Sequence, residues 1–413
     1  MARKMKDSGI EWIGEIPEGW EVGQIGQLYS ERRTKVSDKD YPPLSVTMKG
    51  ILPQLSTAAK TDAHDDRKLV CKGDFAINSR SDRRGSCGIS EQDGSISLIN
   101  TVLQPRGEMN PGYYNWLFHT SMFADEFYKW GHGIVDDLWT TGWSDMKKIG
   151  VPVPSKCEQK QIAAHLNFEC YNIDTMLSKT RSSIEEYKKL KQAVITQAVT
   201  KGVRGEWEMK DSGVEWIGTY PRNWKVIKIK WLLHERKNRS VTGLEEPLSM
   251  SQKKGLIPTK DMDSIPNMAS SFIGAKLVYK GDLVFNKLKA HLGVFSVSKY
   301  NGLVSPDYAV YYSTGLANLN FLELLFKTPR YISEFKKKSS GVGAGLTRLY
   351  TGDLYSIYCA LPPLVEQKEI ADYLDAKCAE IDKLIAKKEQ LVKELESYKK
   401  SLIYEVVTGK REV

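Results

Sequence analysis

Two long stretches of the chain carry apolar residues at nearly alternating spacings of three and four, with lysine and glutamate between them. Such spacing lines the apolar side chains along one face of an α-helix and is typical of a coiled-coil seam. In the later stretch the seam residues are Ile381, Leu384, Leu391, Leu395, Tyr398, Leu402 and Val406. In the earlier stretch they are Ile173, Leu177, Ile184, Tyr187, Leu190, Val194 and Ala198, with polar Thr180 and Ser183 as weak positions.

Both predicted helices have recognisable limits, because each starts after closely spaced prolines and stops at a glycine. The prolines are Pro152, Pro154, Pro362 and Pro363, and the glycines are Gly202 and Gly409. About 40 residues at ~1.5 Å each give a helix of roughly 60 Å, much longer than the mean globular helix. A short amphipathic helix would pack on its own domain. Two helices of this length are instead expected to pack on each other, and the segment 201–224 lets them run antiparallel.

The remaining sequence mixes short β-rich runs with turns and some helix. The run Leu277–Lys287, like Leu69–Ser79, is predicted to be a hairpin with Lys-Gly-Asp at its turn, and Asn320–Lys337 has helical spacing broken at Pro329. We therefore predict an α+β fold, with two mixed α/β domains joined by two long antiparallel helices that form a coiled coil.

The sequence contains an internal duplication, and a repeat this clear predicts two copies of one structural unit. The matching pairs are Met5–Val22 with Met209–Val226, Leu69–Ser79 with Leu277–Lys287, and Val151–Leu166 with Cys359–Leu374. Between these pairs the two copies differ almost everywhere. The predicted segments are an N-terminal segment (1–20), a first domain (21–154), a central helix (155–200), a linker that repeats the N-terminal segment (201–224), a second domain (225–361) and a C-terminal helix (362–413). Two copies that share a scaffold and differ in content suggest two readers of different things.

Composition narrows the class of partner. The 413 residues carry a formal net charge of +9, which suits a polyanion such as nucleic acid. The six cysteines form no CxxC pair, so neither a zinc site nor a disulfide framework is expected. No stretch approaches the roughly 20 apolar residues of a membrane span, and the first residues lack the apolar core of a signal peptide. We expect a cytoplasmic protein with no membrane partner.

Basic residues near the Lys-Gly-Asp turns are the best candidates for contacts with DNA. Arg80, Arg83 and Arg84 follow the turn in the first copy, and Lys287 and Lys289 occupy the same stretch of the second. Such residues can neutralise phosphates, and arginine can pair bidentately with guanine. Three more candidates are Lys253, Lys254 and Arg348. Further basic clusters are Arg32, Arg33 and Lys35, then Arg236, Lys237 and Arg239, and finally Lys336–Lys338. Ordinary solvated surface charge is the preferred explanation for any single cluster, and recurrence after the same turn favours the first two groups, at the Lys-Gly-Asp turns.

Catalytic motifs are weak throughout. The glycine-rich run Gly341–Gly345 lacks the Lys-Ser/Thr of a phosphate loop, and Asn110–Tyr114 only partly matches the adenine methyltransferase motif. The six histidines show no metal-binding spacing. Asp307, Glu334 and Lys336 fit the loose pattern of a metal-dependent nuclease, but the first copy has no counterpart. We expect no catalytic centre and no bound metal, and keep a self-contained magnesium-dependent nuclease and a coiled-coil scaffold without DNA specificity as alternatives.

A family resemblance rests on the duplicated landmarks. The opening Ile16–Trp20, the Lys-Gly-Asp turn, and closely spaced prolines followed by Glu-Gln and a long helix all occur twice. This arrangement resembles the specificity subunits of type I restriction-modification enzymes over nearly the whole chain. The Glu-Gln pairs are Glu158–Gln159 and Glu366–Gln367, and the first copy departs from the pattern by the residues Ser155–Cys157 inserted before its pair.

The resemblance implies a division of labour. Each mixed domain would be a target-recognition domain that reads one half of a split, asymmetric double-stranded DNA sequence, and the helices would set the distance between the halves. Two adenine methyltransferase subunits would bind this chain, and two restriction subunits would join the larger assembly. No cofactor is expected in this chain itself, since S-adenosylmethionine, ATP and magnesium would belong to those partners.

Overall fold

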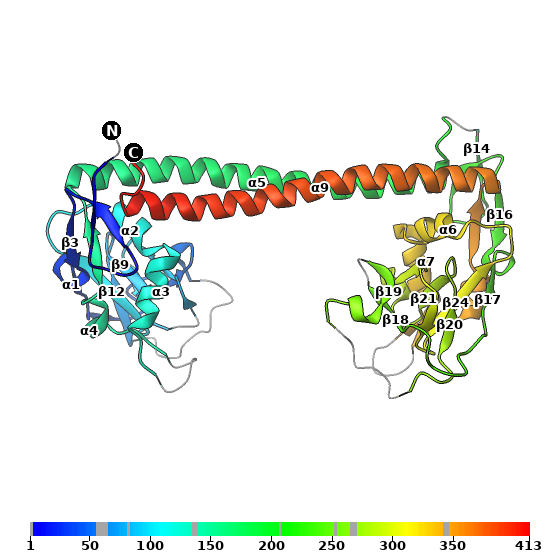
Figure 1. The fold of residues 1–413 in the computed structure, drawn as a ribbon, viewed down its shortest axis with the longest axis horizontal. Helices are drawn as coiled ribbons and strands as arrows, with labels where there is room; N and C mark the ends of the chain where they lie inside the picture. The colour runs from blue at the N-terminus through cyan, green and yellow to red at the C-terminus, as the bar shows by residue number, and fades with distance from the viewer. Residues whose placement is uncertain are drawn as a thin grey trace. The chain divides into compact units, whose positions relative to one another are not determined.

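The computed structural model describes residues 3–54, 65–80, 83–133, 139–205, 208–251, 254–264, 271–341 and 347–413. The chain divides into two compact units, unit 1 (Met1–Arg181 with Glu389–Val413) and unit 2 (Ser182–Lys388). Each unit holds one mixed domain and part of each long helix, α5 (Lys156–Lys201) and α9 (Leu364–Val407) (Figure 1). The sequence prediction divides the chain differently, into six segments in which each long helix is a single segment. That division remains a prediction.

The two long helices start and stop for local reasons. At the start of α5, the Ser155 hydroxyl accepts a hydrogen bond from the N–H of Glu158 (3.3 Å), and the Glu158 carboxylate accepts one from the N–H of Ser155 (3.2 Å). Gly202 and Gly409, just past the helix ends, have φ of 80° and 73°. A residue with a side chain rarely adopts such angles, so glycine suits both stops.

The helices α5 and α9 pack together and run antiparallel. In unit 1, Lys399 of α9 lies 2.6 Å from Asp174 of α5, and in unit 2, Lys191 of α5 lies 2.6 Å from Asp382 of α9. The buried seam residues, each at most 7% exposed, are Ile173, Leu177, Ile184, Ala198, Ile381, Leu402 and Val406. Tyr187, Val194 and Leu395 are partly buried. The expectation of a closed seam is wrong at four positions, since Leu190, Leu384, Leu391 and Tyr398 are 49%, 37%, 42% and 44% exposed.

The domain of unit 1 is built on antiparallel sheets. Its central sheet has the strand order β10-β9-β12-β4, and a second sheet has the order β11-β8-β5. The strands are β1 (Met5–Asp7), β2 (Glu15–Pro17), β3 (Glu21–Gln24), β4 (Tyr29–Glu31), β5 (Lys35–Val36), β6 (Leu44–Thr47), β7 (Gly50–Pro53), β8 (Arg67–Val70), β9 (Phe75–Asn78), β10 (Cys87–Ile89), β11 (Gly94–Ile96), β12 (Asn100–Pro105) and β13 (Gly150–Val153). The short helices are α1 (Ile25–Leu28), α2 (Pro111–Phe118), α3 (Ser121–Lys129) and α4 (Trp143–Met146).

The domain of unit 2 repeats this plan, with the central order β22-β21-β24-β17. Its strands are β14 (Met209–Asp211), β15 (Thr219–Pro221), β16 (Lys225–Lys228), β17 (Leu233–Glu235), β18 (Leu248–Ser251), β19 (Gly255–Pro258), β20 (Lys276–Val278), β21 (Leu283–Asn286), β22 (Phe295–Val297), β23 (Gly302–Val304), β24 (Tyr308–Ser313), β25 (Ser340–Gly341), β26 (Thr347–Arg348) and β27 (Tyr358–Leu361). Its helices are α6 (Leu319–Phe326), α7 (Pro329–Lys338) and α8 (Thr351–Ser356), with 3-10 turns η3 (Ile229–Trp231), η4 (Thr259–Asp261) and η5 (Ala290–Leu292).

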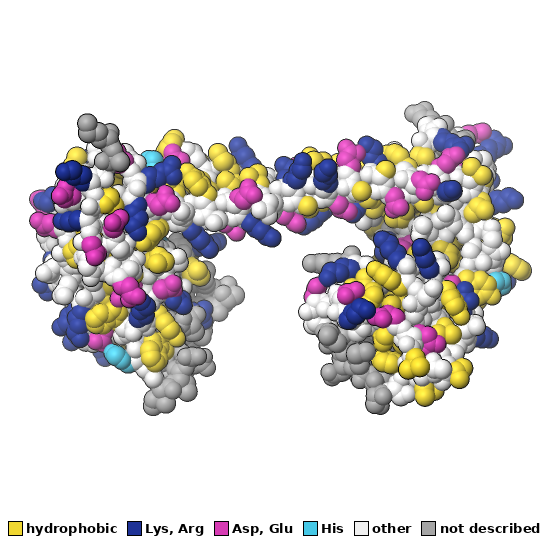
Figure 2. All heavy atoms as spheres, in the orientation of Figure 1, with side chains coloured by type: hydrophobic (Ala, Val, Ile, Leu, Met, Phe, Trp, Pro, Cys, Tyr) yellow, Lys and Arg dark blue, Asp and Glu magenta, His cyan; other side chains and the backbone are white. Residues whose placement is uncertain are grey.

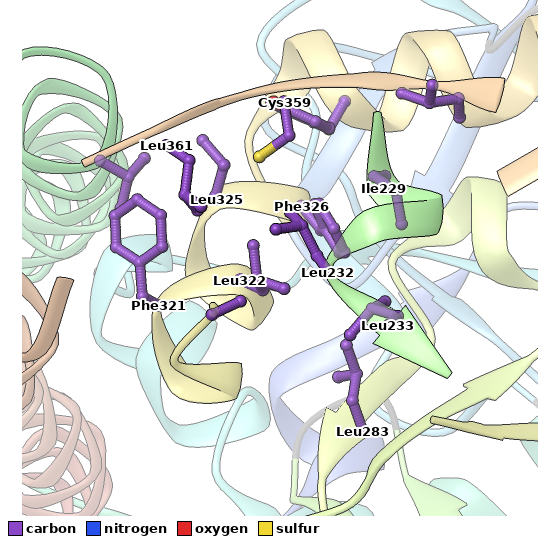
Figure 3. Packing of buried hydrophobic residues seen from close by; sticks show 14 of the residues in the cluster. Ile229, Leu232, Leu233, Leu283, Phe321, Leu322, Leu325, Phe326, Cys359 and Leu361 are labelled. Atoms are coloured by element: carbon purple, nitrogen blue, oxygen red, sulfur yellow. The ribbon is translucent and has the colours of Figure 1, made fainter. Parts of the chain in front are cut away.

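The repeat extends to strand register. Met5 pairs with Pro17 in the first hairpin, and Met209 pairs with Pro221 in its copy. In unit 2 the core forms where α6 lies against the sheet, and Figure 3 shows Leu325 and Phe326 of α6 among Ile229, Leu232 and Cys359. In unit 1 an aromatic core fills the equivalent space. The predicted α+β duplication is therefore confirmed.

The Lys-Gly-Asp turns do not close hairpins, which corrects the prediction. Strand β8 pairs with β5 and β11, whereas β9 pairs with β10 and β12, so the turn carries the chain from one sheet into another. The same holds for β20 and β21. The turn residues were read correctly, with Gly73 at φ 90° and Gly281 at φ 94°. Within the described ranges, no helix is long and apolar enough to cross a membrane.

Candidate DNA interface

In unit 1 the predicted arginines lie on the surface just beyond β9. Arg80, Arg83 and Arg84 are exposed, and Arg84 forms an ion pair with Asp125 while its guanidinium lies 5.0 Å from the ring centre of Tyr128. The N–H of Thr141 donates to the carbonyl of Ser79 (3.0 Å), which ties the segment 139–141 to this strand end. The three exposed arginines follow this strand end and remain candidates for DNA contacts.

Unit 2 builds the same arrangement with different side chains. The N–H of Leu349 donates to the carbonyl of Lys287 (3.0 Å), as Thr141 does to Ser79. The strands β25 and β26 form a two-stranded ribbon in which Ser340 pairs with Arg348, and in unit 1 His132 pairs with Thr140. Lys287 and Arg348 of unit 2 therefore occupy the places of Ser79 and Thr140.

Several charged groups meet around Lys287. Lys276, only 7% exposed, donates to the carbonyl of Tyr308 (2.7 Å) and lies 3.3 Å from Glu235. Arg348 forms an ion pair with Asp307 (2.8 Å). Burial and the charges of Lys276 and Arg348 lower the pKa of Lys287, against the opposing effect of Glu235 and Asp307. The structure brings two predicted residues, Lys287 and Arg348, into one electrostatic environment.

The other predicted lysines are not part of that cluster. Lys254 follows the β18 strand and pairs with Asp263 at 2.7 Å, and Lys289 is exposed immediately before η5. Lys253 lies outside the described residues, as do four of the five residues of the glycine-rich run 341–345. In the view of Figure 2, lysine and arginine side chains are interspersed with acidic ones. The contacts of these lysines with DNA remain predictions.

The aspartate of each Lys-Gly-Asp turn forms an ion pair with an arginine, which the sequence pattern did not predict. The buried Asp74 accepts hydrogen bonds from Nε and Nη2 of Arg32 (2.6 and 3.1 Å), and Asp282 accepts the same pair from Arg236 (2.7 and 2.8 Å). Each aspartate also accepts a backbone N–H at 2.9 Å. These hydrogen bonds stabilise the turn. Arg32 and Arg236 therefore have a structural role, although they fall within basic clusters.

The glutamate of each Glu-Gln pair holds a tryptophan. The indole N–H of Trp20 donates to Glu158 and that of Trp224 donates to Glu366, both at 3.1 Å. Burial alone would raise the pKa of Glu158, but hydrogen bonds from Trp20, Ser155 and Arg3 outweigh burial and lower the pKa to about 2. The repeated Trp and Glu landmarks are therefore partners across each domain.

The glutamine of each pair anchors the next helix. Gln159 accepts the N–H of Asn110 (2.9 Å), Gln367 accepts that of Asn318 (2.7 Å), and each glutamine donates to a proline carbonyl five residues earlier. Asn110 and Asn318 cap the first turns of α2 and α6. Asn110, the first residue of the partial methyltransferase match, therefore acts as a helix cap in this fold.

The acids proposed for a nuclease do not converge. Asp307 pairs with Arg348, and Glu334, 9% exposed, lies 3.9 Å from Lys337. Over the parts of the chain that the structure describes, no group of three or more His, Cys, Asp or Glu residues is placed to hold a metal ion. The nuclease alternative has no structural support.

The chain is similar to known proteins in part of its length by a family model and over nearly all of its length by curated relatives. Residues 221–394 match the family model of the type I restriction modification DNA specificity domain. The chain is 25% identical to the putative MjaX specificity subunit of Methanocaldococcus jannaschii, over 96% of this chain and 95% of that protein. It is 22% identical to the MjaVIII specificity subunit of the same organism, over 96% and 93%.

The fold is shared with solved structures as well. A chain from a study of assembly and conformational transition in the type I restriction-modification system matches with a TM-score of 0.71 and 13% identity, over 96% of this chain and 99% of that one. The HsdS subunit from Thermoanaerobacter tengcongensis matches with a TM-score of 0.57 and 15% identity, over 96% and 98%. The chain is thus similar to type I restriction-modification specificity subunits in its family-model match over residues 221–394, in its curated relatives and in its fold.

Proposed function

We propose that this chain reads a bipartite, asymmetric double-stranded DNA target, with one half-site bound by each domain, and that it performs no catalysis itself. One observation carries the proposal. The two domains have the same strand register and equivalent backbone hydrogen bonds. The positions of Ser79 and Thr140 in the first domain are nevertheless occupied by Lys287 and Arg348 in the second. A common scaffold that presents different side chains suits two readers of different sequences.

Two short half-sites give more discrimination than either alone. Each mismatched base pair costs roughly 1–3 kcal/mol, and the costs add for well-separated positions. The contacts of one domain would then multiply the selectivity of the other. This gain explains why one chain contains two readers.

The duplicated landmarks also suit two copies of one partner. The hairpins β1–β2 and β14–β15 have the same register, and each precedes a tryptophan held by the glutamate of a long helix. We propose that two adenine methyltransferase subunits bind this chain in the cytoplasm and that two restriction subunits complete the larger assembly. S-adenosylmethionine, ATP and magnesium would be held by those partners.

Exchanging one domain tests the proposal. Residues 225–358 would be replaced by the matching domain of a relative, and the methylated sequence would be determined by methylome sequencing with the methyltransferase partner present. We expect one half of the motif to change and the other half to stay. A motif that is unaltered, or changed in both halves, would contradict the assignment of one half-site to each domain.

The absence of catalysis is tested with the chain alone. Purified protein incubated with DNA, magnesium and S-adenosylmethionine should neither cleave nor methylate the DNA. Methylation should occur once the methyltransferase subunit is added. Cleavage by the isolated chain would favour the nuclease alternative. Normal methylation of a bipartite motif in cells that lack this gene would favour a scaffold without DNA specificity.

The arginines of unit 1 have a separate test. Replacing Arg80, Arg83 and Arg84 by alanine should weaken DNA binding and flatten its salt dependence by about one unit of slope for each lost phosphate contact. The matched control removes three exposed lysines of α9, namely Lys383, Lys387 and Lys393. Equal effects in the two triple variants would mean that the arginines contribute only general charge.

A further inference from the structure

Arg348 is held in one orientation at the surface of unit 2. Its Nη2 donates to Asp307 (2.8 Å), and its side chain is 24% exposed. Its Nε is buried and has no hydrogen-bond partner among the described residues. The neighbouring Leu349 is tied by its N–H to the carbonyl of Lys287. Asp307 thus holds one nitrogen of the guanidinium, and the bond from Leu349 to Lys287 holds the backbone that carries Arg348.

Positive charge around Arg348 is only partly compensated. Lys276, Lys287 and Arg348 share this region with two carboxylates. Glu235 is already engaged by Lys276 (3.3 Å) and by the hydroxyl of Thr351 (2.7 Å), which leaves Asp307 for Arg348. Burial is the main cause that lowers the pKa of Lys287, and the charges of Lys276 and Arg348 add to it. A ligand with hydrogen-bond acceptors would complement the three cations, which have only two carboxylates beside them in the part of the chain that the structure describes.

We propose that Arg348 reads a guanine in the half-site bound by the second domain, with Asp307 as the residue that positions it and Lys287 beside it. The proposal rests on the proposed function. Guanine offers O6 and N7 as adjacent acceptors in the major groove, which match the arginine fork. A phosphate can also pair bidentately with arginine, but a phosphate contact would show no preference among base pairs. Thr140 and Ser79 occupy these places in the first domain, so the first domain cannot make this contact from the equivalent positions.

The experiment uses the full chain with its methyltransferase partner. The wild-type motif is determined first, and the half that changes on exchange of residues 225–358 is expected to contain a guanine. Duplexes that vary one base pair at a time then measure discrimination by Arg348→Ala and Arg348→Lys. Both variants should lose roughly tenfold to a hundredfold discrimination at one G·C pair, because lysine restores the charge but not the fork.

Asp307 is tested by its conservative and disruptive variants. Asp307→Asn keeps an oxygen that accepts from Arg348 and should retain most of the discrimination, whereas Asp307→Ala should relax the same G·C position with little change in overall affinity. Thr140→Ala, at the equivalent place in the first domain, should leave that position unchanged. Thermal melts of every variant separate loss of fold from loss of readout.

Three outcomes would overturn the inference while leaving the proposed function intact. These are a second half-site without guanine, an unchanged base preference in Arg348→Ala, and an equal loss for every duplex with a lower salt slope, which marks a phosphate contact. A wild-type chain that directs no bipartite motif at all would instead refute the proposed function.

Discussion

Beyond the strand that follows each Lys-Gly-Asp turn, the first domain places Ser79 beside Thr140 and the second places Lys287 beside Arg348. Around these positions the bonds are the same in both domains, from the turn aspartate that grips an arginine to the glutamine that anchors a helix cap. The comparison teaches that the scaffold is fixed by a few buried polar contacts. Side chains at the presenting positions can then change without altering the backbone that carries them.

The largest expected effect tests whether the shared scaffold depends on the turn aspartates. Asp74→Ala and Asp282→Ala should each lower the free energy of unfolding by about 3 kcal/mol, because each leaves a partly buried arginine without its partner. Hydrogen exchange with mass spectrometry assigns the loss to the mutated domain. The control Asp307→Ala removes a more exposed carboxylate and should cost well under 1 kcal/mol. A large loss in one domain only would break the equivalence of the two.

Much of the architecture follows from local pattern, and the errors arise where distant residues decide. The spacing of Ile173, Leu177 and Ile381 predicts the packed helices, because burial repeats with the helical turn. The hairpin prediction at Lys-Gly-Asp fails because the turn is local, whereas the partners of β8 and β9 come from elsewhere in the chain. No local signal identifies them.

The candidate site was only partly predictable for the same reason. Arg348 and Lys287 were recognised as basic residues, but they are far apart in the sequence and their meeting depends on the bond between Leu349 and Lys287. Asp307, 41 residues from Arg348, fits a nuclease pattern when read alone and is an arginine partner in the fold. The repeated Glu-Gln pair was the signal that could have revealed the scaffold contacts, since both copies keep it.

A smaller effect is expected for the glutamines that anchor α2 and α6. Gln159→Ala and Gln367→Ala should each cost about 2 kcal/mol, because a buried side chain loses its bonds and leaves the N–H of Asn110 or Asn318 unsatisfied. Chemical unfolding measures the loss, and the exposed Gln197→Ala serves as the control. Near-equal losses would sharpen the comparison, whereas a loss confined to Gln367 would show that the second domain relies on its cap more heavily.

The pairing of Trp20 with Glu158 should depend on pH. The folded-state pKa of Glu158 is lowered to about 2, below its ordinary value of 4.5, so its contribution is present above pH 4.5 and is lost as pH falls towards 2. At pH 7, Glu158→Gln should cost about 1 kcal/mol, because solvent screens a part-exposed carboxylate. Unfolding measured from pH 7 to pH 2 should show this difference shrink through the acid range. A difference that is constant with pH would mean that the hydrogen-bonding shape of the side chain matters and its charge does not.

The smallest effect concerns the long helices, where the duplication can be tested one ion pair at a time. Lys399 meets Asp174 in unit 1 as Lys191 meets Asp382 in unit 2, both at 2.6 Å with the lysines 24% and 30% exposed. Exposed pairs contribute little, so Lys399→Ala and Lys191→Ala should each cost about 0.5 kcal/mol, and 1 M salt should remove the difference from wild type. Double-mutant cycles with Asp174→Ala and Asp382→Ala isolate each pair. Coupling energies that differ by more than the measurement error would show that the two halves of the coiled coil are equivalent in sequence pattern but not in stability. A coupling that persists in high salt would mean that the aliphatic part of the lysine side chain packs against the other helix, and that charge contributes little.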